Sequence, residues 1–263
     1  MRQATLVAFY GAKRGPLGSF LRTWQDRLGR AAQRLEAGIA FRPYPLAQIH
    51  ATIIGLERST QRGFRNRNLQ ELTGRAPAMR LPALFAFILE AGHLPFDAQF
   101  GGFENRDDPF RSRGARPYHR SFSIQGRTAV IIGWPVRAPR RGGDGRPTGR
   151  AYPPILDDLR RSAQRFNVLH RWHRESSDVD NDLYLRLGLI AGELAESQRE
   201  LVEDEMRRAL SGSLPLLVQL TTSDLAVVSY PANEETLPIA RSEVVQLTDP
   251  RLRDADFIAR LYA

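Results

Sequence analysis

The chain has 263 residues, of which 42% are hydrophobic and 25% are charged, a composition typical of a globular protein with a full core. It contains no cysteine, which excludes disulfides and thiolate metal sites and favours an intracellular compartment. The N-terminal apolar run is too short for a signal peptide, and no stretch reaches the roughly 20 apolar residues of a membrane span, so we expect a cytoplasmic protein without a membrane partner.

The positive charge of the chain comes almost entirely from arginine. The formal net charge is +9, and Lys13 is the only lysine. A surplus of cations favours anionic partners such as nucleotides and RNA. The arginines are spread along the chain, however, and GC-rich codon usage replaces lysine by arginine without any functional reason. The charge therefore leaves both interpretations open.

The N-terminal part of the chain predicts a strand, a helix and a second strand. The apolar run 4–10 is typical of a strand, and a turn rich in glycine follows it. Apolar residues recur at helical spacing from Leu17 to Leu35, which predicts an amphipathic helix packed on a sheet. The second predicted strand is the run 48–57.

This second strand carries one histidine and one hydroxyl among apolar residues. Because side chains alternate along a strand, His50 and Thr52 share one face, while Ile49 and Ile53 lie on the other. An imidazole can move a proton near neutral pH, and a hydroxyl can donate to an oxyanion. The pair therefore suits a phosphate diester, although a lone histidine on a strand is more often a structural residue.

A polar, basic loop over 58–67 follows and begins with Arg58. Its arginines either bind phosphate or RNA, or simply face solvent. We include Arg58 as a candidate substrate-binding residue. A short helix is predicted over 68–72, and apolar runs predict strands over 84–89 and 96–103.

Two loops rich in arginine, glycine and proline interrupt the middle of the chain, over 104–118 and 136–152. A stretch such as 136–152 cannot bury enough apolar surface to be ordered alone, so it is either a mobile lid over an anionic substrate or a disordered connector. Between the two loops, the runs 121–124 and 128–135 predict a β-hairpin.

The C-terminal half repeats the order of strand, helix and strand. A helix is predicted after Pro154 and a strand over 180–188. A glutamate-rich helix over 193–210 follows. The runs 214–221 and 225–230 then predict two strands that pair with each other and close the sheet.

Three aromatic residues beyond the Pro154 helix suggest metal ligation at first sight. They are His170, Trp172 and His173. No third ligand lies at a useful spacing, so we expect solvated or stacking side chains there and no metal site.

The residues around His50 resemble a known family. His50-x-Thr52, followed by an apolar pair and Gly-Leu-Glu, resembles the two-histidine (HxT) phosphoesterase superfamily, which includes RNA 2′,3′-cyclic phosphodiesterases and 2′-5′ RNA ligase-like proteins. In that family the chain is an internal duplication, and each half contributes one HxT strand to a shared groove. The resemblance implies an α+β fold with two pseudo-symmetric lobes of mostly antiparallel sheet, helices on the outer faces and a central groove.

The second copy of the motif departs from the family. The first repeat spans about 1–80 and the second about 121–263, within a single bilobal domain over 1–263. Tyr184 stands where the family has its second histidine, and Arg186 where it has its second threonine or serine. The residues that flank this pair still resemble the family: Asn-Asp-Leu precedes it and Leu-Gly follows it.

The resemblance implies a mechanism that needs neither a metal ion nor a cofactor. In the family, two histidines face each other across phosphorus and two hydroxyl residues hold the non-bridging oxygens. His50 would then be the base, and Thr52 would hold one oxygen. A phenol is a poor base because its reference pKa is about 10, but Tyr184 can donate a proton to a departing alkoxide, and Arg186 can bind the phosphate.

Alternatives remain open for both the site and the function. His119-Arg120-Ser121 is a second His-x-Ser match, which makes His119 and Ser121 further candidates for contact with the substrate, although this match begins a hairpin. Tyr184 and Arg186 also fit an ordinary polar strand face. We expect either a phosphodiesterase acting on a nucleotide or RNA, with a 2′,3′-cyclic phosphate as substrate, or a catalytically weak or inactive nucleotide- or RNA-binding protein of the same fold.

Overall fold

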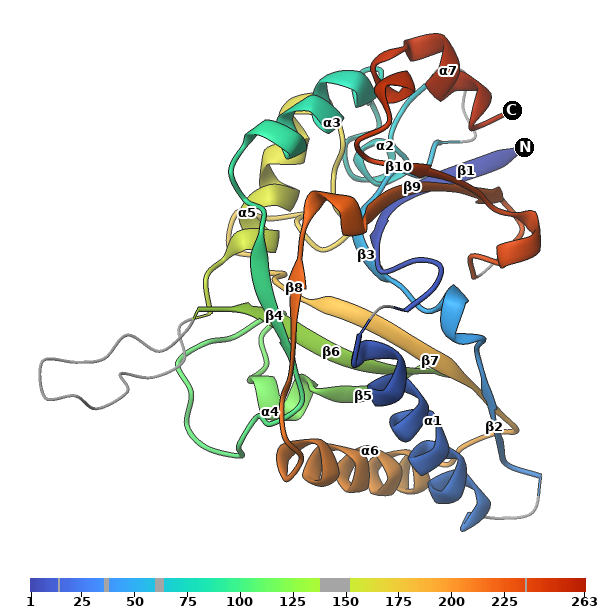
Figure 1. Cartoon of the computed structure of the whole chain (residues 1–263), viewed down its shortest axis with the longest axis vertical. Helices are drawn as coiled ribbons and strands as arrows, with labels where there is room; N and C mark the ends of the chain where they lie inside the picture. Colours follow the sequence, from blue (N-terminus) through green and yellow to red (C-terminus); the bar gives the residue numbers. More distant parts are fainter. Residues whose placement is uncertain (14, 36–37, 60–63, 138–151, 235) are drawn as a thin grey trace, which may run out of the picture.

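Two antiparallel sheets with helices packed around them form the frame of the computed structural model (Figure 1). The structure describes residues 1–13, 15–35, 38–59, 64–137, 152–234 and 236–263. The predicted α+β class, with mostly antiparallel sheets and helices on the outer faces, is confirmed.

The smaller sheet has the strand order β10–β9–β1–β3, and its neighbouring strands are all antiparallel. Its strands are β1 (Arg2–Ala8), β3 (Ala51–Gly55), β9 (Leu225–Pro231) and β10 (Glu243–Gln246).

The larger sheet has the order β2–β7–β6–β4–β8, with β5 paired to β6, and it is also antiparallel. Its strands are β2 (Ala40–Pro43), β4 (Phe96–Phe100), β5 (Phe122–Gln125), β6 (Thr128–Val136), β7 (Leu183–Ala191) and β8 (Leu216–Leu220).

The helices pack on the outer sides of the two sheets. The described residues form α1 (Leu17–Gln33), α2 (Arg67–Thr73), α3 (Leu81–Glu90), α4 (Pro117–Arg120), α5 (Ile155–Ser162), α6 (Glu196–Ser211) and α7 (Ala255–Arg260). In Figure 1, α1 and α6 lie in the lower half of the view, and α3, α5 and α7 lie in the upper half. Within the part of the chain that the structure describes, every helix is too short or too polar to pass through a lipid bilayer.

The two halves of the chain are interleaved. Each half places its two motif-related strands side by side, β1 with β3 and β6 with β7. The strand β2 from the N-terminal half joins the larger sheet, however, and β9 from the C-terminal half joins the smaller one. The helix α1 contacts β7, and α5 contacts β3. The two sheets are therefore tied together by segments from both halves, and β3 contacts β7 where they meet.

Two sequence predictions are wrong. The run 84–89 lies inside α3, because its apolar residues follow the helical period: Leu81, Leu84, Phe85 and Ile88 are the buried ones. The runs at β8 and β9 do not pair with each other; β8 joins β4, while β9 joins β1. Between them, the carboxylate of Asp224 accepts from the backbone N–H of Thr221 at 2.9 Å. The resulting 3-10 turn redirects the chain from one sheet to the other.

Candidate active site

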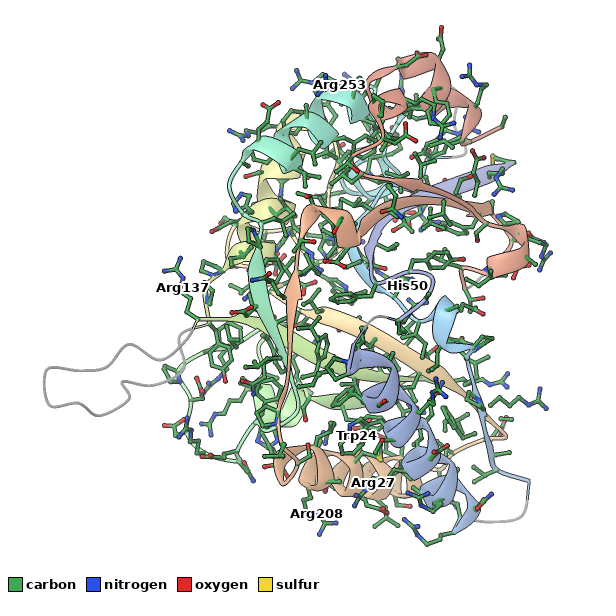
Figure 2. All side chains as sticks on the ribbon, in the orientation of Figure 1. Trp24, Arg27, His50, Arg137, Arg208 and Arg253 are labelled. Atoms are coloured by element: carbon green, nitrogen blue, oxygen red, sulfur yellow. The ribbon has the colours of Figure 1, made fainter. Side chains whose placement is uncertain are left out.

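A cavity of about 360 Å³ lies between the two sheets, where β3 contacts β7. Side chains of β1, β3 and β9 line it from the smaller sheet, and side chains of β5 and β7 line it from the larger one. Pockets for small ligands have volumes of roughly 300–1,000 Å³, so a ligand of nucleotide size has room here. His50 lies at this junction (Figure 2).

His50 stands between the short 3-10 helix η1 (Leu46–Gln48) and β3. Its Nδ1 atom lies 2.8 Å from the carbonyl oxygen of Gln48, which requires a hydrogen on Nδ1. The lone pair of the neutral ring is then on Nε2. The side chain is 9% exposed, lines the cavity and contacts the ring of Tyr10 edge-on. His50 is thus held as a neutral imidazole with Nε2 as its basic atom.

Burial lowers the pKa of His50 to about 4; the backbone hydrogen bond opposes this, and the charges of Arg186 and Lys13 add to it. The ring is therefore unprotonated across the neutral range. Burial also lowers the pKa of Lys13 to about 8. The Nζ of Lys13 donates to the carbonyl oxygens of Phe9 at 2.6 Å and Gly11 at 2.8 Å, which fixes the loop beside His50.

The polar faces of β3 and β7 both line the cavity. Thr52 lines it from β3, and Tyr184 and Arg186 line it from β7. The opposite face of β7 consists of fully buried leucines: Leu183, Leu185 and Leu187. The structure thus brings the four residues predicted as catalytic, including His50, to one cavity.

The strands β3 and β7 share a backbone irregularity at the same point of the motif. The register of β1 against β3 shifts directly after Thr52, so that Ile53 is an extra residue. The register of β6 against β7 shifts in the same way directly after Arg186, so that Leu187 is the extra residue. Bulges of this kind redirect side chains and are frequent next to functional sites. Thr52 and Arg186 therefore occupy equivalent positions in two equivalent strands.

The phenol oxygen of Tyr184 is surrounded by hydrogen-bond donors. The guanidinium groups of Arg113 and Arg120 donate to it, and the side-chain amide of Gln125 donates from 3.3 Å. Burial raises the pKa of the phenol above its usual value, and the carboxylate of Asp182 adds to this, while the two guanidinium groups oppose it. The phenol therefore keeps its proton across the neutral range.

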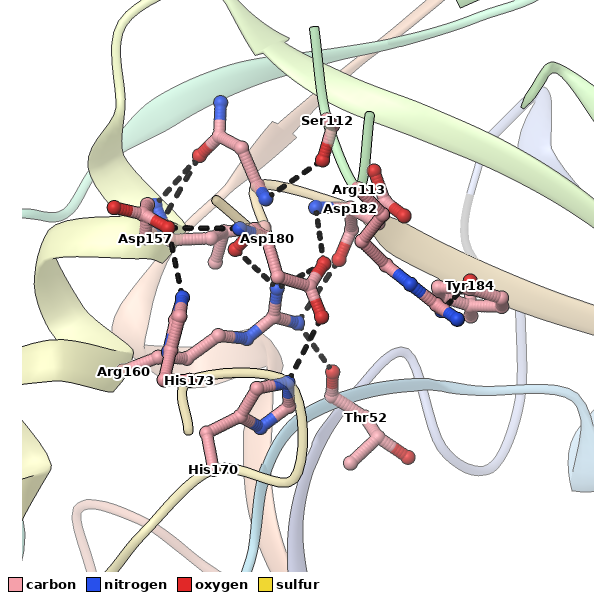
Figure 3. A network of polar contacts seen from close by, with 12 residues as sticks. Thr52, Ser112, Arg113, Asp157, Arg160, His170, His173, Asp180, Asp182 and Tyr184 are labelled. Carbon is pink, nitrogen blue, oxygen red and sulfur yellow. Dashed lines mark hydrogen bonds and ion pairs between the residues drawn. The ribbon is translucent and has the colours of Figure 1, made fainter. Parts of the chain in front are cut away.

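Arg160 of α5 connects the two motif strands, and sequence reasoning missed it. Its side chain is 2% exposed. The guanidinium donates to the carbonyl oxygens of Thr52 at 3.0 Å and Ile53 at 2.9 Å (Figure 3). It also donates to the carbonyl oxygens of Asp180 and Asp182, each at 2.9 Å, and to the carboxylate of Asp180 at 3.2 Å. One buried cation thus fixes β3 to the segment that leads into β7.

Two buried carboxylates continue this network (Figure 3). Asp180 accepts from Nε2 of His170 at 3.0 Å, and Asp157 accepts from Nε2 of His173 at 2.7 Å. Burial acts to raise the pKa of Asp180, but the guanidinium of Arg160 holds it well below its usual range. Solvated or stacking side chains were expected here. Both imidazoles are buried and paired with carboxylates rather than solvated, and their ring centroids lie 5.4 Å apart.

Among the described residues, no group of three or more His, Asp or Glu side chains is arranged to hold a metal ion.

One arginine of the loop 104–118, Arg113, lines the cavity. The guanidinium carbon of Arg113 lies 3.4 Å from the ring centroid of Trp172, which is 39% exposed on the cavity wall. Other arginines of the loop form ion pairs within it: Arg106 with Glu104, and Arg111 and Arg116 with Asp107. Most of the second arginine-rich loop, 138–151, lies outside the described residues.

The three residues predicted to contact the substrate are not among the described residues that line the cavity. Arg58 packs against Tyr262, with its guanidinium carbon 5.8 Å from the ring centroid. His119 lies on α4, and its ring contacts that of Tyr118. Ser121 is 1% exposed, and its hydroxyl donates to the carbonyl oxygen of Tyr118 at 2.8 Å. This hydroxyl is used to end α4.

No family model and no curated protein matches the chain. Among solved structures, a conserved protein of unknown function from Agrobacterium tumefaciens is 14% identical, with a TM-score of 0.44 over 93% of this chain and 85% of that one. A likeness at this level assigns neither a family nor a function.

Acidification will destabilise the protein through its buried histidines. Burial lowers the pKa of His50 and of His170 to about 4, whereas the unfolded chain binds protons with a pKa of about 6.5. The folded state therefore binds fewer protons than the unfolded state. The two histidines make their full contribution to stability above pH 6.5, and this contribution is lost as the pH falls towards 4. We expect a loss of about 2 kcal/mol per histidine between pH 7.5 and pH 5.

Urea unfolding of the wild type and of His50→Asn and His170→Asn at both pH values measures this effect. The quantity to compare is the difference in unfolding free energy between the wild type and each variant. Burial beside Asp180 raises the pKa of Asp182, and this shift makes the folded state more stable at low pH in all three proteins. An equal loss of unfolding free energy in all three chains would contradict the assignment to these histidines.

Proposed function

We propose that the chain is a metal-independent phosphodiesterase acting on a nucleotide or RNA phosphodiester, with a 2′,3′-cyclic phosphate as its substrate. His50 is the base, Tyr184 is the acid, and Thr52 and Arg186 hold the non-bridging oxygens. The observation that carries this proposal is the matched pair of bulged strands, which present an imidazole and a hydroxyl, and a phenol and a guanidinium, to one cavity.

The proposed reaction takes one proton and gives one. Nε2 of His50 removes a proton from the attacking water while the water oxygen bonds to phosphorus. Tyr184 gives its proton to the departing ribose oxygen while the bond from that oxygen to phosphorus breaks. The hydroxyl of Thr52 and the donors of Arg186 offset the charge on the non-bridging oxygens. Exchange with solvent then restores both protonation states.

The pH dependence of the reaction tests this division of roles. We expect kcat/KM for a nucleoside 2′,3′-cyclic monophosphate, assayed with EDTA, to be nearly constant from about pH 5 to about pH 7.5, because kcat/KM reports the groups of the free enzyme. Burial lowers the pKa of His50 to about 4 and raises that of Tyr184, so both groups keep their working states in this range. We limit the expected constant range to about pH 7.5 because Lys13, beside His50, has a pKa of about 8 and loses its charge above that pH.

Tyr184→His is the matched variant for this experiment. The introduced imidazole must be protonated to act as an acid, and the guanidinium groups of Arg113 and Arg120 will hold its pKa at or below the ordinary value of about 6.5. Its kcat/KM should fall about tenfold per pH unit above that pKa. A bell-shaped wild-type profile centred near pH 6.5 would contradict the role of Tyr184. Absence of turnover with cyclic nucleotides and with oligonucleotides ending in a cyclic phosphate would contradict catalysis itself.

Binding of a nucleotide or RNA without cleavage is the second candidate function. The replacement of the family's second histidine and hydroxyl residue by Tyr184 and Arg186 favours it, as does the net charge of +9. Calorimetric titration with the same cyclic nucleotides separates the two candidates. Saturable binding that weakens in Arg186→Met, together with no turnover in the wild type, would support binding alone.

A further inference from the structure

We infer that Arg113 and Arg120 are positioning residues that direct the proton of Tyr184 into the cavity, and that the site is thereby built for phosphodiesters with an alkoxide leaving group. The inference rests on the proposed function. It concerns two arginines that lie outside both copies of the motif.

The hydrogen bonds at Tyr184 determine where its proton points. A phenol oxygen has one hydrogen to donate and lone pairs with which to accept. Arg113, Arg120 and Gln125 all act as donors to this oxygen. A guanidinium has no acceptor atom, so neither arginine can take the phenol hydrogen. Gln125 directs its amide nitrogen, and not its amide oxygen, at the phenol and at the hydroxyl of Ser123. With these three partners all acting as donors, the phenol hydrogen remains for a group inside the cavity that Tyr184 lines.

Arg113 is held in place by its backbone and by stacking. Its φ angle is 50°, a left-handed conformation that non-glycine residues rarely adopt and that persists where the surroundings enforce it. Its backbone N–H donates to the carbonyl oxygen of Val179 at 2.8 Å. Its guanidinium stacks on Trp172, 3.4 Å from the ring centroid. The loop thus presents the guanidinium to Tyr184 in one orientation (Figure 3).

Arg120 is held from the other side by a buried carboxylate. Its Nε donates to Asp182 at 3.0 Å, and the indole N–H of Trp134 donates to the other oxygen of that carboxylate at 2.8 Å. Asp182 is fully buried. The two cations therefore reach the same phenol oxygen from separate segments, each with its own support.

The arrangement matters for the leaving group. When the bond from phosphorus to the leaving oxygen breaks, its electron pair stays on that oxygen, and the proton of Tyr184 moves onto it. The phenolate left behind is stabilised by the two guanidinium groups, and water returns a proton afterwards. A ribose alkoxide needs this proton, whereas p-nitrophenolate is a stable anion that leaves without one.

Comparison of two leaving groups tests the inference. The substrates are a nucleoside 2′,3′-cyclic monophosphate and a nucleoside p-nitrophenyl phosphate diester. On the cyclic substrate, we expect kcat/KM to fall about a hundredfold or more in Tyr184→Phe, and about ten- to a hundredfold in Arg113→Met. On the p-nitrophenyl diester, both variants should stay within about threefold of the wild type. The double variant should be no slower than Tyr184→Phe alone.

Arg171→Met is the matched control, because Arg171 also lines the cavity and lies 5.2 Å from the ring of Trp172. Removing this charge should change both substrates by the same factor. If Arg113→Met also slowed both substrates equally, the guanidinium would act on substrate binding and the inference would be wrong.

A measurement without substrate separates this inference from the proposed function. In protein labelled with ¹³C at the tyrosine ζ carbon, Arg113→Met should raise the phenol pKa of Tyr184 above its wild-type value, because a neighbouring cation is lost. An unchanged phenol pKa would overturn the inference whatever the activity. If the phenol pKa rises as expected but the wild type turns over neither substrate, the proposed function is wrong. The effect of the arginine pair on the phenol of Tyr184 then still holds.

Discussion

We expect turnover of a 2′,3′-cyclic nucleotide to fall about 10²–10⁴-fold when His50 is replaced by asparagine, which is the usual contribution of a general base. The amide of asparagine can still donate to the carbonyl oxygen of Gln48, which Nδ1 of His50 contacts at 2.8 Å, so the chain before β3 keeps its conformation. It cannot take a proton from water. Single-turnover rates at saturating nucleotide measure the loss. Nucleotide affinity should stay within about threefold of the wild type, because Thr52 and Arg186 are unchanged.

Two other histidines complete this experiment. His93 lies after α3, where its ring contacts Phe87, and His93→Asn should keep wild-type activity. His119→Asn tests the alternative His-x-Ser match on α4. If His119→Asn lost activity and His50→Asn kept it, the base would be His119 on α4. If all three variants were as active as the wild type, none of these histidines would act in the mechanism.

The strands that build the site are readable in the sequence because their alternation is strong. Polar and apolar residues alternate in β7 from Leu183 to Leu187, and the three leucines of that stretch are buried. Gly188, which follows the second motif, is one of the residues that match the family's motif, and packing explains why a glycine stands there. A Cβ on Gly188 would lie 2.3 Å from the carbonyl oxygen of Arg42 and 2.7 Å from the ring of Phe41. The strand β2 can pair with β7 at this point only across a glycine.

The parts that the sequence does not reveal are those that depend on distant segments meeting. Arg113, Arg120 and Arg160 come from a loop, a short helix and α5, and no local spacing indicates that they converge on β3 and β7. In an arginine-rich chain, three more arginines carry no signal of their own. The wrong strand over 84–89 has a different cause, because a short, almost wholly apolar run fits both the strand and the helix period.

Replacement of Arg160 by methionine should lower the free energy of unfolding by about 3–5 kcal/mol, the usual cost of breaking a buried ion pair by removing one partner. The variant loses hydrogen bonds to Thr52, Ile53 and Asp182, and it leaves the carboxylate of Asp180 buried without its guanidinium. Urea unfolding followed by circular dichroism measures the change. A loss below about 1 kcal/mol would show that this network does not hold the two sheets together.

The neighbouring Arg161 provides the matched control, because it also pairs with a carboxylate, that of Asp157 at 2.9 Å, but its side chain is 29% exposed. Arg161→Met should cost about 1 kcal/mol or less. Adding Asp180→Asn to Arg160→Met should recover part of the stability, because the unpaired charge is removed while the carbonyl oxygens stay unsatisfied. If stability returns and turnover does not, the guanidinium has a role beyond folding. It would then fix the distance between the imidazole on one sheet and the phenol on the other, a distance that neither strand can set alone.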